Sequence, residues 1–131
     1  LYVGQTARTN RAAVDQLSKI LGPAGYRVIG VPLTKCLHLK SACTAIGSHQ
    51  VLINPEWVPA EMFSGLGVTT VDPDEPFGAN AVVVGRHLIV PGSAPLTRQR
   101  LVSAGFQAVA VDISEFEKAE AAATCLSIIL S

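Results

Sequence analysis

Cysteine and histidine, two residue types suited to nucleophilic and acid–base chemistry, occur together in the segment CLHLKSAC, residues 36 to 43. A third cysteine, Cys125, lies near the end of the chain. A cysteine thiolate is a strong nucleophile, and a histidine within hydrogen-bonding reach can act as general acid or base. Cys125 and His38 therefore form a candidate catalytic pair. The competing interpretation is structural, because a cysteine opening an apolar strand and a histidine between leucines more often pack in cores or at their edges.

Arg8 and the cysteines beside His38 suggest two further kinds of site. Arg8, in QTARTN, follows a predicted strand and precedes a predicted helix cap, where a guanidinium can hold a carboxylate through two hydrogen bonds. A solvated loop arginine is the alternative. Cys36 and Cys43 lie close enough to His38 for a metal site to be considered. No further cysteine or histidine completes a tetrahedral set of ligands, so we predict no metal site.

Length and composition indicate one globular domain over residues 1–131. Hydrophobic residues make up 49% of the chain and charged residues 15%, with ten acidic and ten basic side chains. This balance argues against disorder and against a broad electrostatic attraction to nucleic acid or to an anionic membrane. No apolar run approaches the roughly 20 residues that span a bilayer, and three cysteines make no disulfide framework. We therefore expect a cytoplasmic protein with no nucleic-acid or membrane partner.

Short strands and helices alternate along the chain in a pattern that repeats. Val31, Val71 and Val111 close three equivalent strands at intervals of 40 residues, and each unit between them reads loop, strand, tight turn, strand, helix, strand. The predicted class is α/β with repeated ββαβ modules. Ser114 is a good N-cap for a last short helix, with Glu117 placed for a capping box. We expect strands at 1–4, 26–32, 43–47, 50–54, 67–71, 80–85, 87–91 and 106–111, and helices between a Thr9 or Asn10 cap and Gly22, at 59–64, at 95–103 and at 114–120.

The domain is then the tail of one module, two complete modules, and the opening strand of another at 125–131. Such modules bury apolar faces against their neighbours, often around a common axis. Around an axis the loops entering the first strands converge, which brings together 38–41, 78–80 and Thr124-Cys125. An array that starts and stops within a module has open strand edges, so we expect a partner there, either the rest of a longer protein or a second copy of the chain.

Four segments together resemble one known family. YVGQTARTN, LHLKSACTAIG, VDPDEPFGAN and SEFEKAEAAATCLS follow the order and spacing of the second half of dimethylarginine dimethylaminohydrolase, of the guanidino-group-modifying pentein superfamily. The resemblance extends over essentially the whole chain, and its most specific parts are the runs GxxxRTN, HLKS and TCxS. It implies a propeller of five ββαβ modules, of which this chain, as a C-terminal half, would hold about three.

The resemblance also implies site residues and a reaction. Cys125 matches the nucleophile that attacks the guanidinium carbon, and His38 matches the general acid and base. Arg8 matches the arginine that holds the substrate's α-carboxylate, and Ala119 lies where a main-chain carbonyl contacts the substrate. The implied reaction converts a small guanidino substrate, an N-methylated arginine, to citrulline and a methylamine. It passes through a covalent S-alkylthiouronium and uses no cofactor.

Some features depart from the family pattern. The carboxylates that bind the guanidinium come from the family's first half, and Asp72 and Asp74 do not correspond to them. Ala121-Ala122-Ala123 replaces a glycine that usually precedes the nucleophile, which predicts a stiffer loop. Two hypotheses follow. The chain is part of an amidinohydrolase that needs its missing N-terminal half and is poorly active alone, or it is a non-catalytic half-propeller that self-associates through open sheet edges.

Overall fold

The computed structural model describes residues 1–130, and its first unit is a parallel strand pair joined by a helix. Strands β1 (Tyr2–Gln5) and β2 (Ile29–Pro32) are connected by α1 (Arg11–Leu21) and the short 3₁₀ helix η1 (Gly22–Ala24). The side chain of Asn10 accepts a hydrogen bond of 3.1 Å from the N–H of Ala13, which confirms the predicted helix start. Among residues 1–130, no helix is both long and apolar enough to cross a membrane.

The second and third units share one topology. The second contains β3 (Cys43–Gly47), β4 (Gln50–Ile53), the 3₁₀ helix η2 (Ala60–Phe63) and β5 (Gly67–Thr70), and the third contains β6 (Val82–Val84), β7 (His87–Pro91), α3 (Pro95–Ser103) and β8 (Gln107–Val111). In both units the first strand pair is antiparallel and the second is parallel. A short helix precedes each first strand, α2 (Leu39–Ala42) before β3 and the 3₁₀ helix η3 (Pro76–Ala79) before β6. The repeated ββαβ class predicted from the sequence is confirmed.

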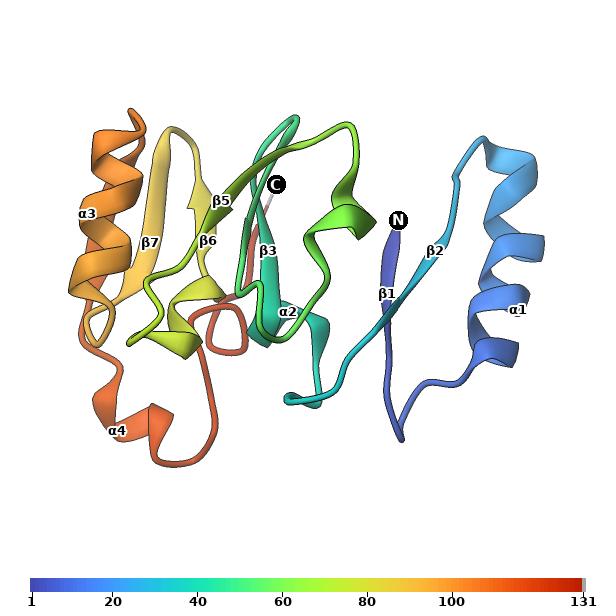
Figure 1. The fold of residues 1–131 in the computed structure, drawn as a ribbon, viewed down its shortest axis with the longest axis horizontal. Coiled ribbons are helices and arrows are strands. Elements are labelled where there is room, and N and C mark those ends of the chain that lie inside the picture. Colours follow the sequence, from blue (N-terminus) through green and yellow to red (C-terminus); the bar gives the residue numbers. More distant parts are fainter. Residues whose placement is uncertain (131) are drawn as a thin grey trace.

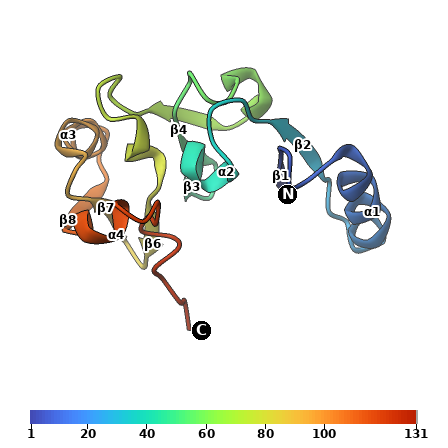
Figure 2. The ribbon, with the colours of Figure 1, turned by 90° about the horizontal axis from the view of Figure 1, so that it is seen from below.

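The three units lie side by side in an arc, with α1 and α3 on its outer side and β1, β3 and β6 toward its inner side (Figure 1, Figure 2). The hairpin turns at 48–49 and 85–86 lie at one end of the molecule. The turn after β1, helix α2 and the short helix α4 (Ser114–Glu117) lie toward the opposite end (Figure 1). The segments that carry the candidate residues therefore lie toward the same end of the molecule, the end opposite the hairpin turns (Figure 1).

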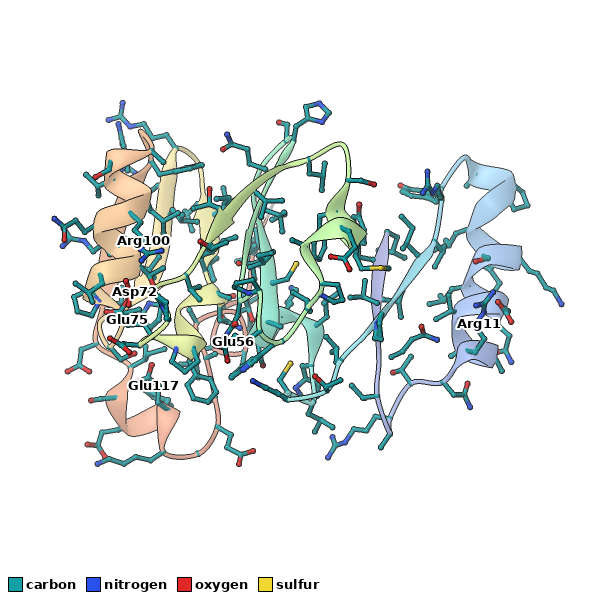
Figure 3. All side chains as sticks on the ribbon, viewed as in Figure 1. Arg11, Glu56, Asp72, Glu75, Arg100 and Glu117 are labelled. Atoms are coloured by element: carbon teal, nitrogen blue, oxygen red, sulfur yellow. The ribbon has the colours of Figure 1, made fainter. Side chains whose placement is uncertain are left out.

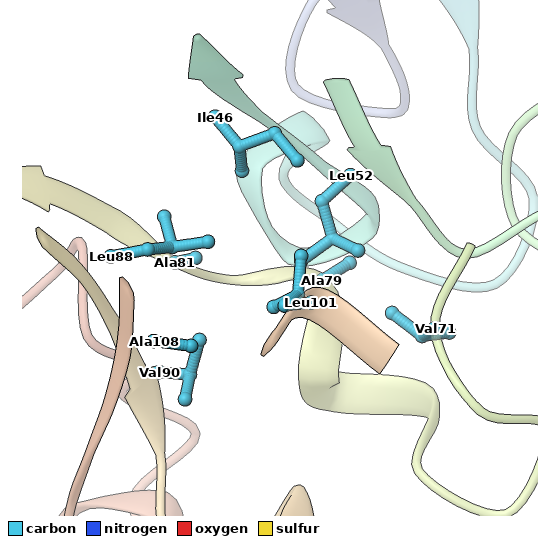
Figure 4. Close-up of a cluster of buried hydrophobic side chains, with 9 residues drawn as sticks. All are labelled: Ile46, Leu52, Val71, Ala79, Ala81, Leu88, Val90, Leu101 and Ala108. Carbon is cyan, nitrogen blue, oxygen red and sulfur yellow. The ribbon is translucent and has the colours of Figure 1, made fainter. Parts of the chain in front are cut away.

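The hydrophobic core lies between neighbouring units. One cluster joins the second and third units around Leu52 and Leu101, both fully buried (Figure 4). The other joins the first and second units, where the rings of Tyr2 and Phe63 pack with centroids 5.0 Å apart. Each unit thus buries its apolar residues against a neighbour, as expected for stacked modules. The first cluster comprises Ile46, Leu52, Val71, Ala79, Ala81, Leu88, Val90, Leu101 and Ala108, and the second comprises Val31, Ala42, Cys43, Val51, Ile53, Trp57, Val58 and Phe63.

The loop between β5 and η3 is tied to the first turns of α3. The Glu75 carboxylate accepts hydrogen bonds from the N–H groups of Leu96 and Thr97, at 2.8 and 2.6 Å. Asp72 forms an ion pair of 2.7 Å with Arg100 (Figure 3). These bonds hold the segment that leads into the 78–80 loop, one of the three loops predicted to converge.

The strand predicted at 125–131 is wrong for the residues that the structure describes. Residues 123–126 form a turn, residues 127–130 form no strand, and Ile128 and Leu130 are 87% and 89% exposed. A strand needs an adjacent strand for its backbone hydrogen bonds, and no strand of residues 1–130 pairs with this segment. Ser131 lies outside the described residues. Strand β2 begins at Ile29, which pairs with Tyr2 of β1, rather than at residue 26.

The capping box predicted for the last helix is also wrong. Ser114 is the first residue of α4 rather than its cap, and the Asp112 carboxylate accepts a hydrogen bond of 3.0 Å from the Ser114 N–H. An ionised carboxylate is a stronger acceptor than a hydroxyl, so it takes the capping role. Glu117 points to a different element and accepts a hydrogen bond of 2.6 Å from the hydroxyl of Ser93.

Candidate active site

Three segments distant in the sequence meet at the side chain of Asn80, which is 2% exposed. Its Nδ2 donates to the carbonyl oxygen of Lys40 and to the hydroxyl of Thr124, each at 2.9 Å. Its Oδ1 accepts a hydrogen bond of 2.8 Å from the N–H of Thr124. Lys40 lies two residues after His38, and Thr124 immediately precedes Cys125. The loops expected to converge around the axis therefore do meet.

Thr44 holds the main chain on both sides of Asn80. The Thr44 hydroxyl donates to the carbonyl oxygen of Ala79 at 2.6 Å and accepts from the N–H of Ala81 at 3.2 Å. The side chain of Thr44 belongs to β3 and is buried. The second unit therefore fixes the position of Asn80 through its backbone as well as through its side chain.

His38 is exposed at the N-terminal end of α2. Its carbonyl oxygen accepts hydrogen bonds from the Ser41 N–H, at 3.0 Å, and from the Cys36 thiol, at 3.5 Å. These bonds hold the main chain of His38, while its imidazole forms no hydrogen bond with residues 1–130. The structural interpretation of His38 as a core residue is therefore wrong, and its ring is accessible to a ligand.

Cys125 lies in a turn directly after the contact with Asn80. Its N–H donates to the carbonyl oxygen of Ala122 at 2.9 Å. The Ser127 hydroxyl donates to the carbonyl oxygen of Thr124 at 3.1 Å. The thiol is free and exposed, as a nucleophile must be and as a core cysteine is not. The structure brings together the segments that carry Cys125 and His38, while no hydrogen bond joins the two side chains themselves.

Ala119 follows α4 at a sharp change of chain direction. The next residue, Glu120, has a φ of 58°, in the left-handed region that residues other than glycine rarely adopt. Backbone strain of this kind costs about 1–3 kcal/mol and is common at functional sites. The carbonyl of Ala119 accepts no hydrogen bond from residues 1–130, so it is available to a ligand.

Arg8 lies at the tip of the turn between β1 and α1. The turn is closed by two backbone hydrogen bonds between Thr6 and Thr9, at 3.1 and 3.2 Å, and the Arg8 N–H donates to the hydroxyl of Thr6. The guanidinium is exposed and has no ion-pair partner within residues 1–130. Arg8 belongs to the first unit, and within residues 1–130 no hydrogen bond joins its side chain to His38 or Cys125.

A cavity of about 540 Å³ lies beside His38. Its wall includes Ser41, Asn80 and the segment 120–122 that leads toward Cys125. Cys125, Ala119 and Arg8 do not line it, so this cavity unites only part of the predicted site. Four acidic residues also line it, and two of them already have hydrogen-bond partners in the protein. The four are Asp74, Glu75, Glu117 and Glu120.

The two cysteines beside His38 have different environments. Cys43 is buried in the core between the first two units, and burial raises the pKa of its thiol to about 12. Burial also raises the pKa of the Cys36 thiol. Raised pKa values keep both thiols protonated at neutral pH, which makes them poor nucleophiles and poor metal ligands. Within residues 1–130, no three side chains of histidine, cysteine or acidic type are grouped to hold a metal ion.

Sequence reasoning did not find the roles of Thr44 and Glu75. Both act through hydrogen bonds to residues more than 20 positions away, on other loops or helices. Thr44 interrupts the apolar residues of β3, and a polar side chain in a buried strand was the one available signal. The spacing of residues in the sequence does not show which groups the Thr44 hydroxyl bonds to.

The ββαβ units, their parallel and antiparallel pairings and their arc are those of a pentein-type α/β propeller. The chain superposes with a TM-score of 0.85 on a solved structure of dimethylarginine dimethylaminohydrolase from Pseudomonas aeruginosa complexed with citrulline, at 29% identity. This match covers 95% of the chain and 49% of that structure. The N-terminal domain of an arginine dihydrolase of cyanobacteria has the same fold, with a TM-score of 0.83 at 22% identity.

Two of the relatives that match nearly the whole chain are at least 30% identical to it in sequence. The N(G),N(G)-dimethylarginine dimethylaminohydrolase of Streptomyces coelicolor is 41% identical over 129 residues, which is 98% of this chain and 49% of the relative. The enzyme of the same description from Pseudomonas aeruginosa is 30% identical over 127 residues, 97% of this chain and 50% of the relative. The chain therefore spans about half the length of these relatives. No protein-family model matches it.

Proposed function

We propose that this chain is the C-terminal part of an amidinohydrolase of the dimethylarginine dimethylaminohydrolase family. It supplies the nucleophile and the acid–base residue for hydrolysis of an N-methylated arginine to citrulline and a methylamine. The single observation that carries the proposal is the meeting of the His38 and Cys125 segments at Asn80. The 41% identity to the Streptomyces relative supports the choice of substrate class.

In the first half of the reaction, the thiolate of Cys125 adds to the guanidinium carbon. The bond from that carbon to the methylated nitrogen then breaks, and the imidazolium of His38 gives its proton to the departing amine. The substrate carbon is left bonded to sulfur as a cationic thiouronium, and His38 is left neutral. Charge and protons balance, because one proton has moved from His38 to the amine.

In the second half, neutral His38 takes one proton from a water molecule as the water oxygen adds to the thiouronium carbon. The carbon–sulfur bond breaks and returns the Cys125 thiolate. The carbon–oxygen double bond of the ureido group forms as the remaining hydroxyl proton passes to solvent. Citrulline and the starting form of both residues result, so His38 serves as acid and then as base.

Two further residues contact the substrate in this proposal. Arg8 holds its α-carboxylate through charge-assisted hydrogen bonds, which the exposed and unpaired guanidinium permits. The carbonyl of Ala119 accepts a hydrogen bond from the substrate, and the change of chain direction at Glu120 orients it. Neither Arg8 nor Ala119 touches the cavity beside His38, so both require the complete ring to close around the substrate.

The complete site needs a partner for this chain. A guanidinium is a delocalised cation, and attack at its carbon gains little stabilisation unless buried carboxylates hold it. Glu75 and Glu117, in the cavity wall, already bond to α3 and to Ser93. Within residues 1–130, β1 pairs only with β2, whereas the matching strands β4 and β7 are paired on both sides. We propose that the other half of a propeller, or a second copy of the chain, pairs there and supplies the carboxylates.

Citrulline release from dimethylarginine tests the function. The chain is assayed alone and mixed with the part of the Streptomyces relative that it does not match, each beside Cys125→Ala and His38→Ala. We expect the mixture to release citrulline and both variants to abolish release. His49→Ala removes an exposed histidine in the hairpin turn between β3 and β4, at the other end of the molecule, and should leave the rate unchanged. An inactive mixture, or a Cys125→Ala variant as active as the parent, would overturn the proposal.

A further inference from the structure

We propose that Asn80 is a positioning residue for this reaction: its side-chain amide sets the placement of Cys125 relative to His38. The inference rests on the proposed function, in which those two residues act together. It adds Asn80, which hydrogen-bonds to Lys40 and Thr124, near His38 and Cys125 in the chain, rather than to those two residues themselves. Its basis is the three hydrogen bonds of one buried side chain to two loops.

The chemistry of these bonds requires an amide. Nδ2 donates to the Lys40 carbonyl oxygen and the Thr124 hydroxyl, while Oδ1 accepts from the Thr124 N–H. A carboxylate could replace the acceptor but not the donor, and an apolar side chain could replace neither. Because Asn80 is 2% exposed, water has little access to replace a lost bond. The amide is therefore a specific bridge between the two loops.

Other elements hold the main chain on both sides of Asn80 and the loop that precedes it. Thr44 bonds the main chain on either side of Asn80, and Glu75 and Asp72 tie the preceding loop to α3. The backbone around Asn80 is therefore held by β3 and, through the preceding loop, by α3. The Thr124 turn, by contrast, leads into residues 125–130, which form no strand among the described residues. The Asn80 amide thus joins the Thr124 turn to this support, and an error of about 1 Å in such placement can cost about 100-fold in rate.

Asn54 provides a matched control for burial. It is 3% exposed, its Nδ2 donates to the Pro76 carbonyl oxygen at 3.0 Å, and its Oδ1 accepts from the Glu56 N–H at 2.9 Å. Like Asn80, it bridges two loops with both ends of its amide. Its N–H donates to the carbonyl oxygen of Ala42 at 2.8 Å, a backbone bond that an alanine at this position would keep. Its side chain hydrogen-bonds to neither the His38 segment nor the Cys125 segment. Loss of either asparagine should destabilise the fold, while only the loss of Asn80 should uncouple Cys125 from His38.

A thiol-labelling cycle tests the coupling without any need for hydrolysis. The rate of Cys125 alkylation by iodoacetamide is followed by peptide mass spectrometry in the parent, Asn80→Ala and Asn54→Ala chains, each with and without His38→Ala. We expect His38→Ala to change the rate several-fold in the parent and in Asn54→Ala, but by less than about two-fold in Asn80→Ala. An equal effect of His38→Ala in all three backgrounds, or none in the parent, would overturn the inference.

The complemented enzyme gives the second readout. Asn80→Ala should lower kcat by about 10- to 100-fold with little change in KM, because the reacting groups rather than the bound substrate are displaced. Asn54→Ala should lower the unfolding midpoint as much yet keep kcat within about two-fold of the parent.

If Asn80→Ala does not fold, Thr124→Val removes the hydroxyl partner at a less buried position and should lower kcat in the same direction. Equal kcat losses for both asparagine variants would show a structural role only. If the parent mixture is inactive, the proposed function fails while the labelling cycle still decides the coupling.

Discussion

Glu75 and Thr97 are joined by a hydrogen bond of 2.6 Å in which the Glu75 carboxylate accepts from the backbone N–H of Thr97. The same carboxylate accepts from the N–H of Leu96. The N-cap position of α3 is Ala94, whose side chain has no acceptor. A residue about 20 positions away therefore caps this helix, and the cap also joins the loop before η3 to the outer side of the third unit.

Loss of this cap should destabilise the fold. Glu75→Ala leaves two N–H groups of α3 without their acceptor, so we expect the free energy of unfolding to fall by about 1–2 kcal/mol. Glu75→Gln keeps one acceptor oxygen and should lose less. Urea denaturation measures both. Glu56→Ala, which removes only an exposed ion pair with Lys35, is the control and should change the free energy by less than about 1 kcal/mol. A Glu75→Ala chain as stable as the parent would show that α3 needs no cap.

Gly78 should tolerate no side chain. A Cβ at this position would lie 2.9 Å from Oγ1 of Thr97 and 3.2 Å from Cβ of Ala94, and both residues are buried. We expect Gly78→Ala to lower the free energy of unfolding by about 1–3 kcal/mol, measured by thermal or urea denaturation. At Gly47, exposed in β3, the nearest atom to an added Cβ is 3.7 Å away, which is ordinary van der Waals contact, so Gly47→Ala should change the free energy of unfolding by less than about 1 kcal/mol. The prediction fails if the two variants unfold alike.

The stability of the fold should fall at alkaline pH because of Cys43. Burial raises the pKa of its thiol to about 12, whereas an unfolded cysteine ionises near pH 8.5, so unfolding releases a proton between these values. The stabilisation is complete below about pH 8.5 and is lost as the pH rises toward 12, by at most about 1.4 kcal/mol per pH unit.

Urea midpoints measured from pH 7 to pH 11 test this dependence. Cys43→Ala removes the ionising group, so its midpoint should vary less with pH than that of the parent, although its stability at neutral pH will be lower. Cys125→Ala removes an exposed thiol and should follow the parent. A Cys43→Ala profile parallel to the parent's would assign the alkaline loss to another group.

Arg8 should affect substrate binding rather than the chemical step. In the complemented enzyme, Arg8→Ala removes charge-assisted hydrogen bonds to the α-carboxylate, so we expect KM to rise by about 10- to 100-fold with a smaller change in kcat. Arg8→Lys keeps the charge but loses the bidentate geometry, so its KM should lie between those of the parent and Arg8→Ala. Arg11→Ala removes a neighbouring arginine whose partner is Asp15 and should leave KM unchanged. Steady-state kinetics with dimethylarginine would contradict the assignment if both alanine variants had the same KM.

Secondary structure could be predicted wherever its cause is local. The Asn10 cap and Gly22 bound α1 as expected, and the positions of the two tight hairpin turns follow from short-range patterns. The failures have non-local causes. The segment 125–130 has the composition of a strand but no strand of the described chain beside it, and the cap of α4 comes from Asp112 rather than from Ser114.

The sequence alone determined the order of the elements, their 40-residue repeat and the candidates His38, Cys125 and Arg8, because each depends on residue type and spacing. Ala119 became a candidate only through the resemblance to a known family. Only the tertiary structure decided that Asn80 joins the two reactive segments, through hydrogen bonds between residues 40 and 44 positions apart. Such bonds form when neighbouring units bury their apolar faces against one another, and that packing depends on the whole folded chain rather than on any local pattern.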